Sequence, residues 1–183
     1  MSEKQPLLKD SDIQADNPQH FESLVKRHQS SVFAFLGRMG FSQSQAEDIA
    51  QEAFLKAWRA LKSYSADRAA FSTWLFTIVR NTALSEIAKN RRRPLRYDTD
   101  TVEQVCEETE SADAVEQHQL RTRLQHSLNA LSVDDRDVLA LAYSQELNST
   151  EAASVLGCAP GTYRTRLTRA KQRLRKIWEA NDE

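Results

Sequence analysis

The chain has 183 residues, of which 40% are apolar and 28% are charged, and its formal net charge is −1. This length fits one large domain or two small ones, and a content of only four glycines and four prolines favours helices throughout. No apolar run is long enough to cross a bilayer, and the first residues hold no apolar signal-peptide core. We therefore expect a cytoplasmic protein with no membrane insertion.

The sequence also argues against metal sites and catalysis. Cys106 and Cys158 lie far apart, in segments of different character, and a structural disulfide is not expected in a reducing compartment. The histidines show no metal-ligand spacing with these cysteines. The sequence contains no P-loop, nucleophile elbow or metal–carboxylate motif. We predict that the protein is not an enzyme and that it uses no metal and no cofactor.

Charge is arranged along the chain in blocks of alternating sign. Residues 80–96 carry six Lys and Arg against a single acid, whereas residues 97–120 carry eight acids and neither Lys nor Arg. Bases return in residues 161–178, which contain seven Lys and Arg and no acid. The pattern predicts two basic modules and an acidic connector. Because residues 95–113 are too acidic and too poor in apolar residues to pack alone, we predict a flexible linker there.

The first predicted helix follows residues 1–16, which are polar and expected to be loose. Asn17 and Pro18 are typical of a helix start, the former as a cap and the latter in the first turn. Apolar residues then recur at steps of three and four as far as Met39, which gives a helix of about six turns. Gly40 is expected to end it.

A second and a third helix complete the predicted N-terminal domain, residues 17–94. Ser44 and Glu47 predict a capping box, and a clean apolar stripe runs through residues 46–61, including Trp58. The third helix is expected from about residue 71 to residue 92, ended by Pro94. Three long helices with short connections can share one core. At 100° per residue, the polar face of the second helix carries Asp48, Gln51, Glu52, Leu55 and Arg59.

The second predicted domain, residues 114–183, ends in a helix-turn-helix. Ser132 predicts one helix start, and Asn148 with Glu151 forms a capping box that opens a short helix ended by Gly157. Pro160 suits the first turn of the last helix, which is basic around one apolar stripe and so suits the DNA major groove. That stripe is Leu167, Ala170, Leu174, Ile177 and Trp178. The first helix of the domain is expected to bury Val115, Leu120, Leu124, Leu128 and Leu131.

The predicted fold is therefore all-α, with two small helical domains joined by a flexible acidic linker, and three of its motifs resemble a known family. These are AEDIAQEAFLKAWRAL at 46–61, FSTWLFTIVRNTALSEIAKNRRR at 71–93 and LSVDDRDVLALAYSQELNSTEAASVLGCAPGTYRTRLTRAKQRLRKI at 131–177. In this order, with an acidic linker between the second and third, they resemble the extracytoplasmic-function group of bacterial sigma factors. These factors are the promoter-specificity subunits of RNA polymerase. The resemblance covers residues 21–178.

The resemblance implies that the N-terminal domain, residues 17–94, is a sigma region 2-like domain, which binds core RNA polymerase and melts the promoter. Its core-binding residues would contact a coiled coil of the largest polymerase subunit. An ordinary solvated face is the alternative, but Leu55 is out of place on such a face, which favours an interface. The residues that match the family's core-binding helix are Asp48, Gln51, Glu52 and Leu55.

The third helix and the loop before it would open and read the downstream promoter element. Strand opening needs a positive track for the backbone and flat groups that accept unstacked bases, and this segment interleaves both. Trp74 shares the apolar stripe, which favours a core position for it over base contact. Ser85 and Ala88 depart from the charged residues common in the family. The residues assigned to downstream DNA by the resemblance are Tyr64, Arg80, Asn81, Ser85, Lys89, Arg91 and Arg92.

By the same resemblance, the second domain, residues 114–183, is a sigma region 4-like domain, which would read the upstream element through the N-terminal part of its last helix. Arg164 or Arg166 could form a bidentate pair with guanine, whereas Arg173 is expected to meet phosphate or solvent. Ala159 replaces the usual Ser cap of this helix. The residues that match family DNA contacts are Thr162, Tyr163, Arg164, Thr165, Arg166 and Arg169.

Two functions are consistent with these features. The first is an alternative sigma factor that directs promoter recognition, DNA melting and transcription initiation, held by an anti-sigma factor until a stress signal. The second is an autonomous helix-turn-helix transcription regulator whose N-terminal half is a sensing or dimerising bundle. A regulator has no need for the 46–61 pattern beside a basic, aromatic helix, and this favours the sigma factor.

Overall fold

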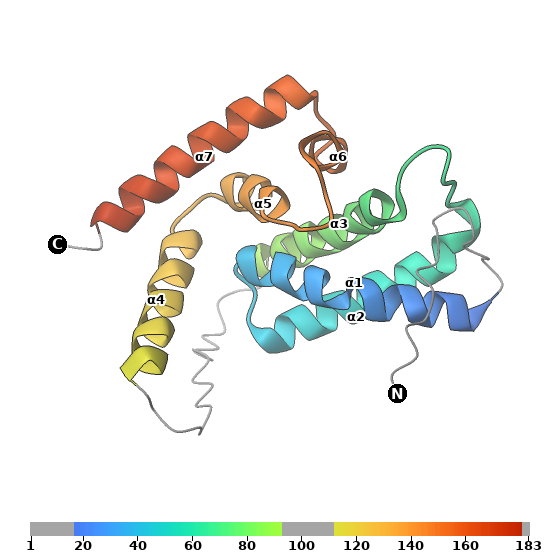
Figure 1. Cartoon of the computed structure of the whole chain (residues 1–183), viewed down its shortest axis with the longest axis horizontal. Coiled ribbons are helices and arrows are strands. Elements are labelled where there is room, and N and C mark those ends of the chain that lie inside the picture. The colour runs from blue at the N-terminus through green and yellow to red at the C-terminus, as the bar shows by residue number, and fades with distance from the viewer. Residues whose placement is uncertain (1–16, 93–111, 181–183) are drawn as a thin grey trace.

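The computed structural model describes residues 17–92 and 112–180, and every long regular element in these two ranges is an α-helix (Figure 1). The predicted all-α fold is therefore confirmed for these ranges. The predicted loose N-terminus and the acidic linker lie outside the described residues, apart from residues 112 and 113, which open a helix. Within the described ranges, no helix has the length and apolarity that a membrane span requires.

The first three long helices are α1 (Pro18–Arg38), α2 (Gln43–Ala60) and α3 (Phe71–Arg92), with a short 3₁₀ turn, η2 (Leu61–Ser63), after α2. The Asn17 side chain accepts a hydrogen bond from the Gln19 backbone N–H at 3.0 Å, which confirms the predicted cap of α1. Gly40 follows α1 with φ 93°, a conformation open to glycine at little cost.

The predicted capping box of α2 is wrong by two residues. The cap is Ser42, whose hydroxyl accepts from the Gln45 backbone N–H at 3.4 Å. The Gln45 side chain in return accepts from the Ser42 N–H at 3.0 Å. Ser44 and Glu47 already lie in the helix, where the Glu47 carboxylate accepts from Gln43 Nε2 at 3.1 Å. Both serines have a suitable partner three residues later, and the earlier pair begins the helix.

The three helices share one apolar core, as their stripes predict. Val32, Phe35 and Leu36 of α1 are fully buried. The Phe35 ring meets the Phe76 ring of α3 edge to face, with centroids 5.7 Å apart at 89°. From α2 the small residues Ala53 and Ala57 are fully buried, which lets the neighbouring helix backbones approach closely.

The remaining helices are α4 (Ala112–Asn129), α5 (Val133–Ala142), α6 (Ser149–Val155) and α7 (Pro160–Ala180). Their predicted start and stop signals are confirmed. Asn148 Oδ1 accepts from the backbone N–H of Glu151 at 3.0 Å, and the Glu151 carboxylate accepts from the Asn148 N–H at 2.7 Å. Ser132 caps α5, and Gly157 follows α6 with φ 69°. Thus α6, its turn and α7 form the predicted helix-turn-helix.

The predicted buried face of α4 is only partly correct. Leu128 and Leu131 are buried, but Leu120 is 54% exposed and Leu124 is 43% exposed. Figure 1 shows the reason, because the start of α4 projects away from the other helices, whereas its C-terminal half meets them, as where Arg123 donates to the Trp178 carbonyl of α7. The side chain of Val115 lies outside the described residues.

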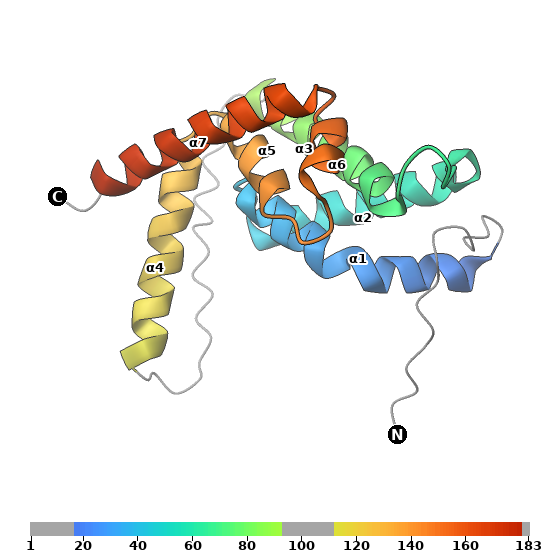
Figure 2. The same ribbon diagram turned by 45° about the horizontal axis from the view of Figure 1, so that its top comes forward.

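The two groups of helices pack directly against each other, which the sequence did not predict. α5 lies against α1 and α6 lies against α3, while α7 lies on the outer side of α5 and α6 (Figures 1 and 2). As a result one continuous core cluster contains buried residues of both groups, including Val32 and Phe76 from the first and Val138, Leu141 and Ala153 from the second.

Candidate functional site

The polar face of α2 is exposed where the sequence places it. Asp48, Gln51 and Glu52 are exposed, and Leu55 is 48% exposed although it is a large apolar residue. Lys56 Nζ lies 2.7 Å from Glu52 Oε1, and this hydrogen-bonded pair lowers the pKa of Glu52. The face therefore combines acidic side chains with an apolar side chain open to solvent.

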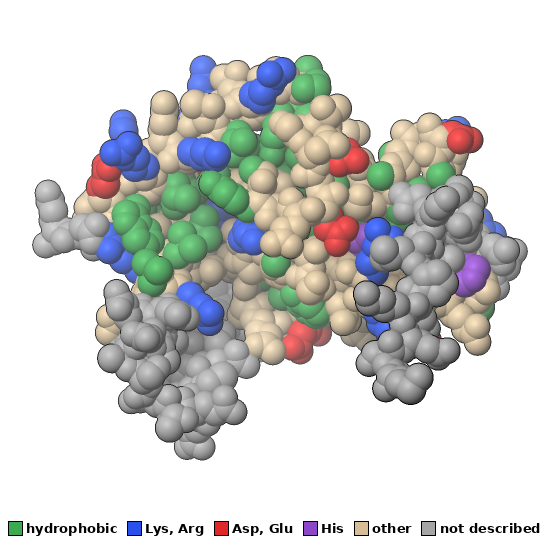
Figure 3. Space-filling model, in the orientation of Figure 1, with side chains coloured by type: hydrophobic (Ala, Val, Ile, Leu, Met, Phe, Trp, Pro, Cys, Tyr) green, Lys and Arg blue, Asp and Glu red, His purple; other side chains and the backbone are tan. Residues whose placement is uncertain are grey.

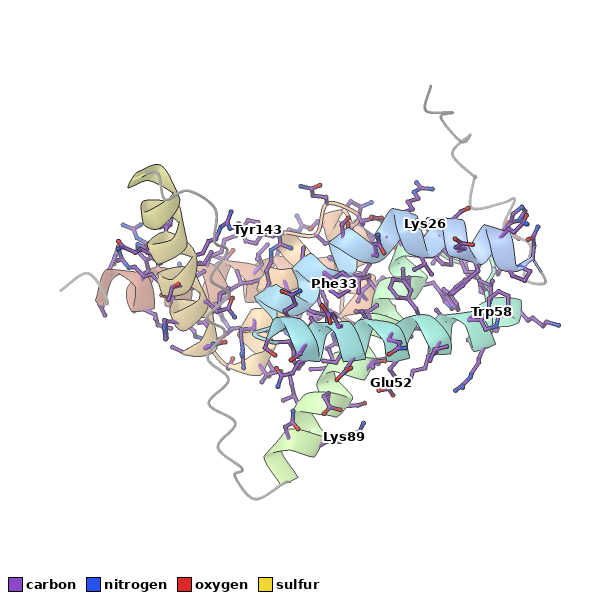
Figure 4. All side chains as sticks on the ribbon, turned by 90° about the horizontal axis from the view of Figure 1, so that it is seen from below. Lys26, Phe33, Glu52, Trp58, Lys89 and Tyr143 are labelled. Carbon is purple, nitrogen blue, oxygen red and sulfur yellow. The ribbon has the colours of Figure 1, made fainter. Side chains whose placement is uncertain are left out.

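An apolar groove of about 670 Å³ runs between α1 and α2 beside this face. Asp48, Gln51 and Leu55 line one wall, and Phe33 is on the other. Figure 4 shows the two helices side by side, with Phe33 and Trp58 along the seam and Glu52 on α2. Three of the four residues assigned to polymerase binding thus belong to one concave surface.

Two aromatic residues of this groove were missed or misplaced by the sequence. Trp58 was expected in the buried stripe of α2, but it is 36% exposed and packs its ring at 5.1 Å from the Phe21 ring. Phe33 is 38% exposed, and it was not identified from the sequence because it lies beside the apolar stripe of α1 rather than on it. An aromatic residue next to a complete apolar stripe was the signal that could have revealed it.

The downstream-DNA candidates are divided between surface and interior. Asn81, Ser85 and Lys89 are exposed on α3, where Ser85 Oγ donates to the Asn81 carbonyl at 2.8 Å. Lys89 Nζ lies 3.2 Å from Glu86 Oε2. Arg91 and Arg92 end α3, but their side chains lie outside the described residues.

Tyr64 belongs to an aromatic cluster that closes the loop before α3. Its hydroxyl donates to the Ala69 carbonyl at 3.2 Å, and its ring centroid lies 5.5 Å from that of Phe71 and 5.4 Å from that of Trp74. All three rings are buried or half-buried, as the apolar stripe predicted for Trp74. The cluster fixes the loop on the start of α3.

Arg80 is not on the open surface with Asn81 and Ser85. Its Nε donates to Asp137 Oδ2 of α5 at 2.7 Å, and its side chain is 19% exposed. The Asp137 side chain is 3% exposed, and no residue in the described part of the chain gives its Oδ1 atom a hydrogen bond. Burial raises the pKa of Asp137, and the neighbouring Arg80 offsets only part of this increase.

The upstream-DNA candidates on α7 are exposed with one exception. Figure 3 shows Lys and Arg side chains over α7 along the upper edge of the molecule. The Thr165 hydroxyl donates to the Gly161 carbonyl at 3.1 Å, so the threonine side chain is held close to its own helix. The exposed candidates are Thr162, Arg164, Thr165, Arg166 and Arg169.

The assignment of Tyr163 to DNA contact is wrong in this structure. The residue is 1% exposed, and its burial raises the pKa of the hydroxyl to about 12. Tyr163 precedes Leu167 by four positions and Ala170 by seven, so it continues the apolar stripe of α7 into the core. The spacing that identified the stripe could have identified this residue as well.

Arg173 also differs from the prediction of a phosphate or solvent contact. Its Nη1 lies 2.7 Å from Asp135 Oδ1 and 2.8 Å from Asp135 Oδ2, so the guanidinium ties α7 to α5. Among the residues that the structure describes, no three His, Cys, Asp or Glu side chains are grouped so that they could hold a metal ion.

Comparisons with known proteins agree with this arrangement. The model of sigma-70 region 2 matches residues 24–93, and the model of sigma-70 region 4 matches residues 121–174. The RNA polymerase sigma-H factor of Pseudomonas aeruginosa is 32% identical over 174 residues, which cover 90% of this chain and 89% of the relative. The ECF RNA polymerase sigma-E factor of Escherichia coli K12 is 32% identical over 170 residues, 87% of each chain.

Two solved structures share the fold. CnrH, solved in complex with the cytosolic domain of CnrY, superposes with a TM-score of 0.65 at 24% identity, covering 91% of this chain and 92% of that one. The sigma factor RpoE of Bartonella quintana, solved with the anti-sigma factor NepR, gives a TM-score of 0.66 at 24% identity, covering 88% and 98%. With both sigma-70 models matched in order and sigma factors related over most of its length, the chain belongs to the extracytoplasmic-function group of sigma-70 family sigma factors.

Proposed function

We propose that this chain is an alternative sigma factor, which binds core RNA polymerase in the cytoplasm and directs promoter recognition, DNA melting and transcription initiation. Polymerase carries out the chemistry, whereas this chain binds polymerase and positions it on the promoter. The observation that carries the proposal is the separation of two unlike surfaces on one molecule. An apolar groove flanked by acids lies between α1 and α2, and a basic face free of acids lies on the first turns of α7.

The groove and the adjoining polar face of α2 form the proposed polymerase-binding surface. Asp48, Gln51 and Leu55 line it, and Glu52 lies beside it. A partly exposed leucine and two partly exposed aromatic rings are side chains that gain stability when a partner removes them from water. The charged rim would orient a partner helix that carries basic residues.

The N-terminal part of α7 is the proposed reader of the upstream promoter element. Arg164 and Arg166 are exposed near the start of this helix, where side chains of a helix-turn-helix reach base edges. A guanidinium can donate to both O6 and N7 of guanine, which selects that base. Thr162, Thr165 and Arg169 complete the surface.

The proposed downstream reader consists of α3 and the loop before it. Asn81, Ser85 and Lys89 present polar and cationic groups to solvent. Arg80, Arg91 and Arg92 would add positive charge for the single-strand backbone, and Tyr64 would contribute from the loop. In this assignment residues 17–94 form the polymerase-binding and melting domain, residues 95–113 the linker and residues 114–183 the upstream reader.

We further propose that an anti-sigma factor holds the protein inactive until a stress signal. The support is that CnrH and RpoE, two solved structures that share this fold, were each determined in complex with a second protein, which for RpoE is named as an anti-sigma factor.

Polymerase-dependent transcription tests the proposed function. The full chain is incubated with core RNA polymerase, retained on a tagged polymerase subunit, and then assayed by run-off transcription on a library of promoter fragments. A sigma factor is retained and yields discrete transcripts that core polymerase alone does not make. A chain that binds DNA but neither joins polymerase nor supports transcripts would instead be an autonomous helix-turn-helix regulator.

A further inference from the structure

The turn that joins α6 to α7 holds Cys158, the one cysteine in the described part of the chain (Figure 1). We propose that Cys158 is a modification site, at which a hydroperoxide oxidises the thiol to a sulfenic acid and thereby weakens the reading of the upstream promoter element by α7. The effect on DNA reading rests on the proposed function, whereas the chemistry at the thiol does not depend on it.

The backbone of Cys158 takes part in the C-terminal cap of α6. Its N–H donates to the Ala153 carbonyl at 3.0 Å, and the Gly157 N–H donates to the Ser154 carbonyl at 3.0 Å. With Gly157 at φ 69°, these two hydrogen bonds form a Schellman motif. Cys158 is therefore fixed to the end of α6 by its backbone.

The side chain of Cys158 belongs to the start of α7. The Ala159 carbonyl accepts from the Tyr163 N–H at 3.0 Å, so Ala159 is the cap residue, and its methyl group cannot accept a hydrogen bond. Cys158 before the cap and Tyr163 four positions after it occupy the two places of a hydrophobic staple, which sets the angle at which a helix begins. Both side chains belong to the same core cluster, Tyr163 as a fully buried member and Cys158 as a half-buried one. The direction of α7 therefore depends on this pair.

The hydroxyl of Tyr163 is an unused hydrogen-bond donor near the thiol. Tyr163 is 1% exposed, and no residue in the described ranges gives its hydroxyl a partner. Burial raises the pKa of this hydroxyl to about 12, and the Cys158 thiol and Asp137 add to the increase. Because a buried hydroxyl without a partner is costly, an acceptor placed on the Cys158 sulfur would be stabilised there.

Oxidation by hydrogen peroxide supplies such an acceptor. The Cys158 sulfur, as its thiolate, attacks one peroxide oxygen, so that an S–O bond forms and the O–O bond breaks. Sulfur loses two electrons to the peroxide, and the departing hydroxide takes up the proton that the thiol released and leaves as water. Because Cys158 is only half-buried, a molecule as small as hydrogen peroxide can reach its sulfur.

The added oxygen alters the staple and with it the first turns of α7. It enlarges and polarises one of the two side chains that set the angle of the helix, at the edge of a closely packed core. Arg164 and Arg166 lie directly after Tyr163, and a bidentate contact with guanine requires close alignment. A small change in the direction of α7 therefore weakens that contact, while the α1–α2 groove is unaffected.

The chemistry is tested on the full chain carrying Cys106→Ser, so that Cys158 is its only thiol. The chain is treated with hydrogen peroxide, trapped with dimedone, digested and mapped by mass spectrometry, and an adduct on Cys158 is expected. The control is Ser154→Cys in a chain that lacks both native cysteines, which places an exposed thiol on α6. With dimedone added after increasing delays, the sulfenic acid at Cys158 should persist roughly threefold to tenfold longer, the effect of one hydrogen bond.

Tyr163→Phe removes the donor and keeps the ring of the staple. In the Cys106→Ser chain it should shorten the lifetime of the sulfenic acid toward that of the Ser154→Cys control. Peroxide should also lower the melting temperature of this variant more than that of the chain that retains Tyr163. The untreated variant should melt at or slightly above the same chain, so a folding defect would be seen before peroxide is added.

The effect on promoter reading is measured by run-off transcription. Peroxide is removed before core polymerase is added, and the template is a promoter fragment that the untreated chain uses. Oxidation is expected to lower promoter-specific transcription roughly tenfold, the loss of one bidentate base contact, while retention on tagged polymerase stays the same. Dithiothreitol should restore transcription. Cys158→Ser, or Cys158→Ala should the serine variant fold poorly, should not respond to peroxide.

Each part of the proposal has an outcome that would overturn it. Absence of an adduct on Cys158 in the folded chain, when the urea-unfolded chain is labelled, would overturn the modification site. An equal lifetime in Tyr163→Phe would overturn the role of the hydroxyl. An adduct without loss of transcription, or an equal loss in Cys158→Ser, would overturn the effect on DNA reading. An untreated chain that yields no transcripts would count against the proposed function itself, and adduct mapping would still decide the site.

Discussion

Arg173 of α7 donates from Nη1 to both carboxylate oxygens of Asp135 of α5, at 2.7 and 2.8 Å. The same carboxylate accepts from the hydroxyl of Ser132, the residue that caps α5. One acidic side chain thus joins the start of α5 to the middle of α7, the proposed DNA-reading helix. The orientation of that helix depends on a residue that would not itself touch DNA.

We expect Asp135→Ala to destabilise the second helix group. The substitution removes the partner of Arg173 and weakens the first turn of α5, and because Arg173 is largely exposed the loss is about 1–2 kcal/mol. Urea denaturation followed by circular dichroism measures it. Arg175→Ala, which removes an exposed pair with Glu179, is the matched control and should leave the free energy of unfolding almost unchanged, because solvent screens that pair.

The pH dependence of stability should carry a contribution from Asp137. Burial raises the pKa of this carboxyl above its ordinary value of 3.8, so the folded chain binds the proton more tightly than the unfolded chain does. The stability gained from this protonation is fully present below the unfolded pKa and is lost as pH rises through the raised folded pKa. Because an asparagine at position 137 is uncharged at every pH, Asp137→Asn should remove this loss of stability at higher pH.

At pH 7 we expect Asp137→Asn to have the same free energy of unfolding as the parent chain, or one higher by up to about 1–2 kcal/mol. Urea titrations at a series of pH values would measure the difference between the two proteins. A variant that was markedly less stable than the parent at pH 7 and equally stable in acid would show the opposite sign, and the Arg80 pair would then dominate over burial.

Substitutions in the α1–α2 groove should weaken polymerase binding without unfolding the chain. Leu55→Ala removes a side chain that is 48% exposed, so folding loses little, whereas a complex would lose about 1–2 kcal/mol or roughly tenfold in affinity. Gln51→Ala and Glu52→Ala should act in the same direction. Fluorescence anisotropy with core polymerase and a thermal melt separate the two effects.

Lys26→Ala is the control for the groove, because Lys26 is exposed on α1 and pairs with Glu22 one turn away. It should bind polymerase as the parent chain does. A large fall in melting temperature for Leu55→Ala would identify Leu55 as a structural residue instead.

Arg164→Ala and Arg166→Ala should each reduce promoter-specific transcription while core binding stays intact. A bidentate contact with a base contributes about 1–3 kcal/mol of discrimination, so about a tenfold or greater loss is expected from whichever arginine makes it. Run-off transcription and a polymerase pull-down on the same preparations provide the two readouts. Equal loss of polymerase binding would contradict the assignment of these residues to DNA.

Tyr163 should tolerate loss of its hydroxyl but not of its ring. No hydrogen-bond partner for the buried hydroxyl is found in the described part of the chain, so Tyr163→Phe is expected to be neutral or slightly stabilising. Tyr163→Ala leaves a cavity and should cost about 3–5 kcal/mol. Denaturant unfolding distinguishes them, and unchanged promoter selection by Tyr163→Phe would agree with a core role.

Local signals accounted for most of the helical framework. Asn17, Asn148 and Ser132 cap helices where the sequence placed them, and Gly40 and Gly157 take positive φ after α1 and α6. These features depend on hydrogen bonds within four residues and on periodicity along one helix, so they can be read without tertiary information. Where two serines were equally placed, as at the start of α2, the local signal could not choose between them.

By itself the sequence determined the helices, the separation of the charge blocks and the family, because caps, apolar spacing and motif order are properties of the chain in one dimension. Only the tertiary structure decided that Trp58 borders a groove and that Arg80 meets Asp137. Exposure and pairing depend on which helices pack together. That choice is made by surfaces brought from distant parts of the chain, which no local pattern encodes.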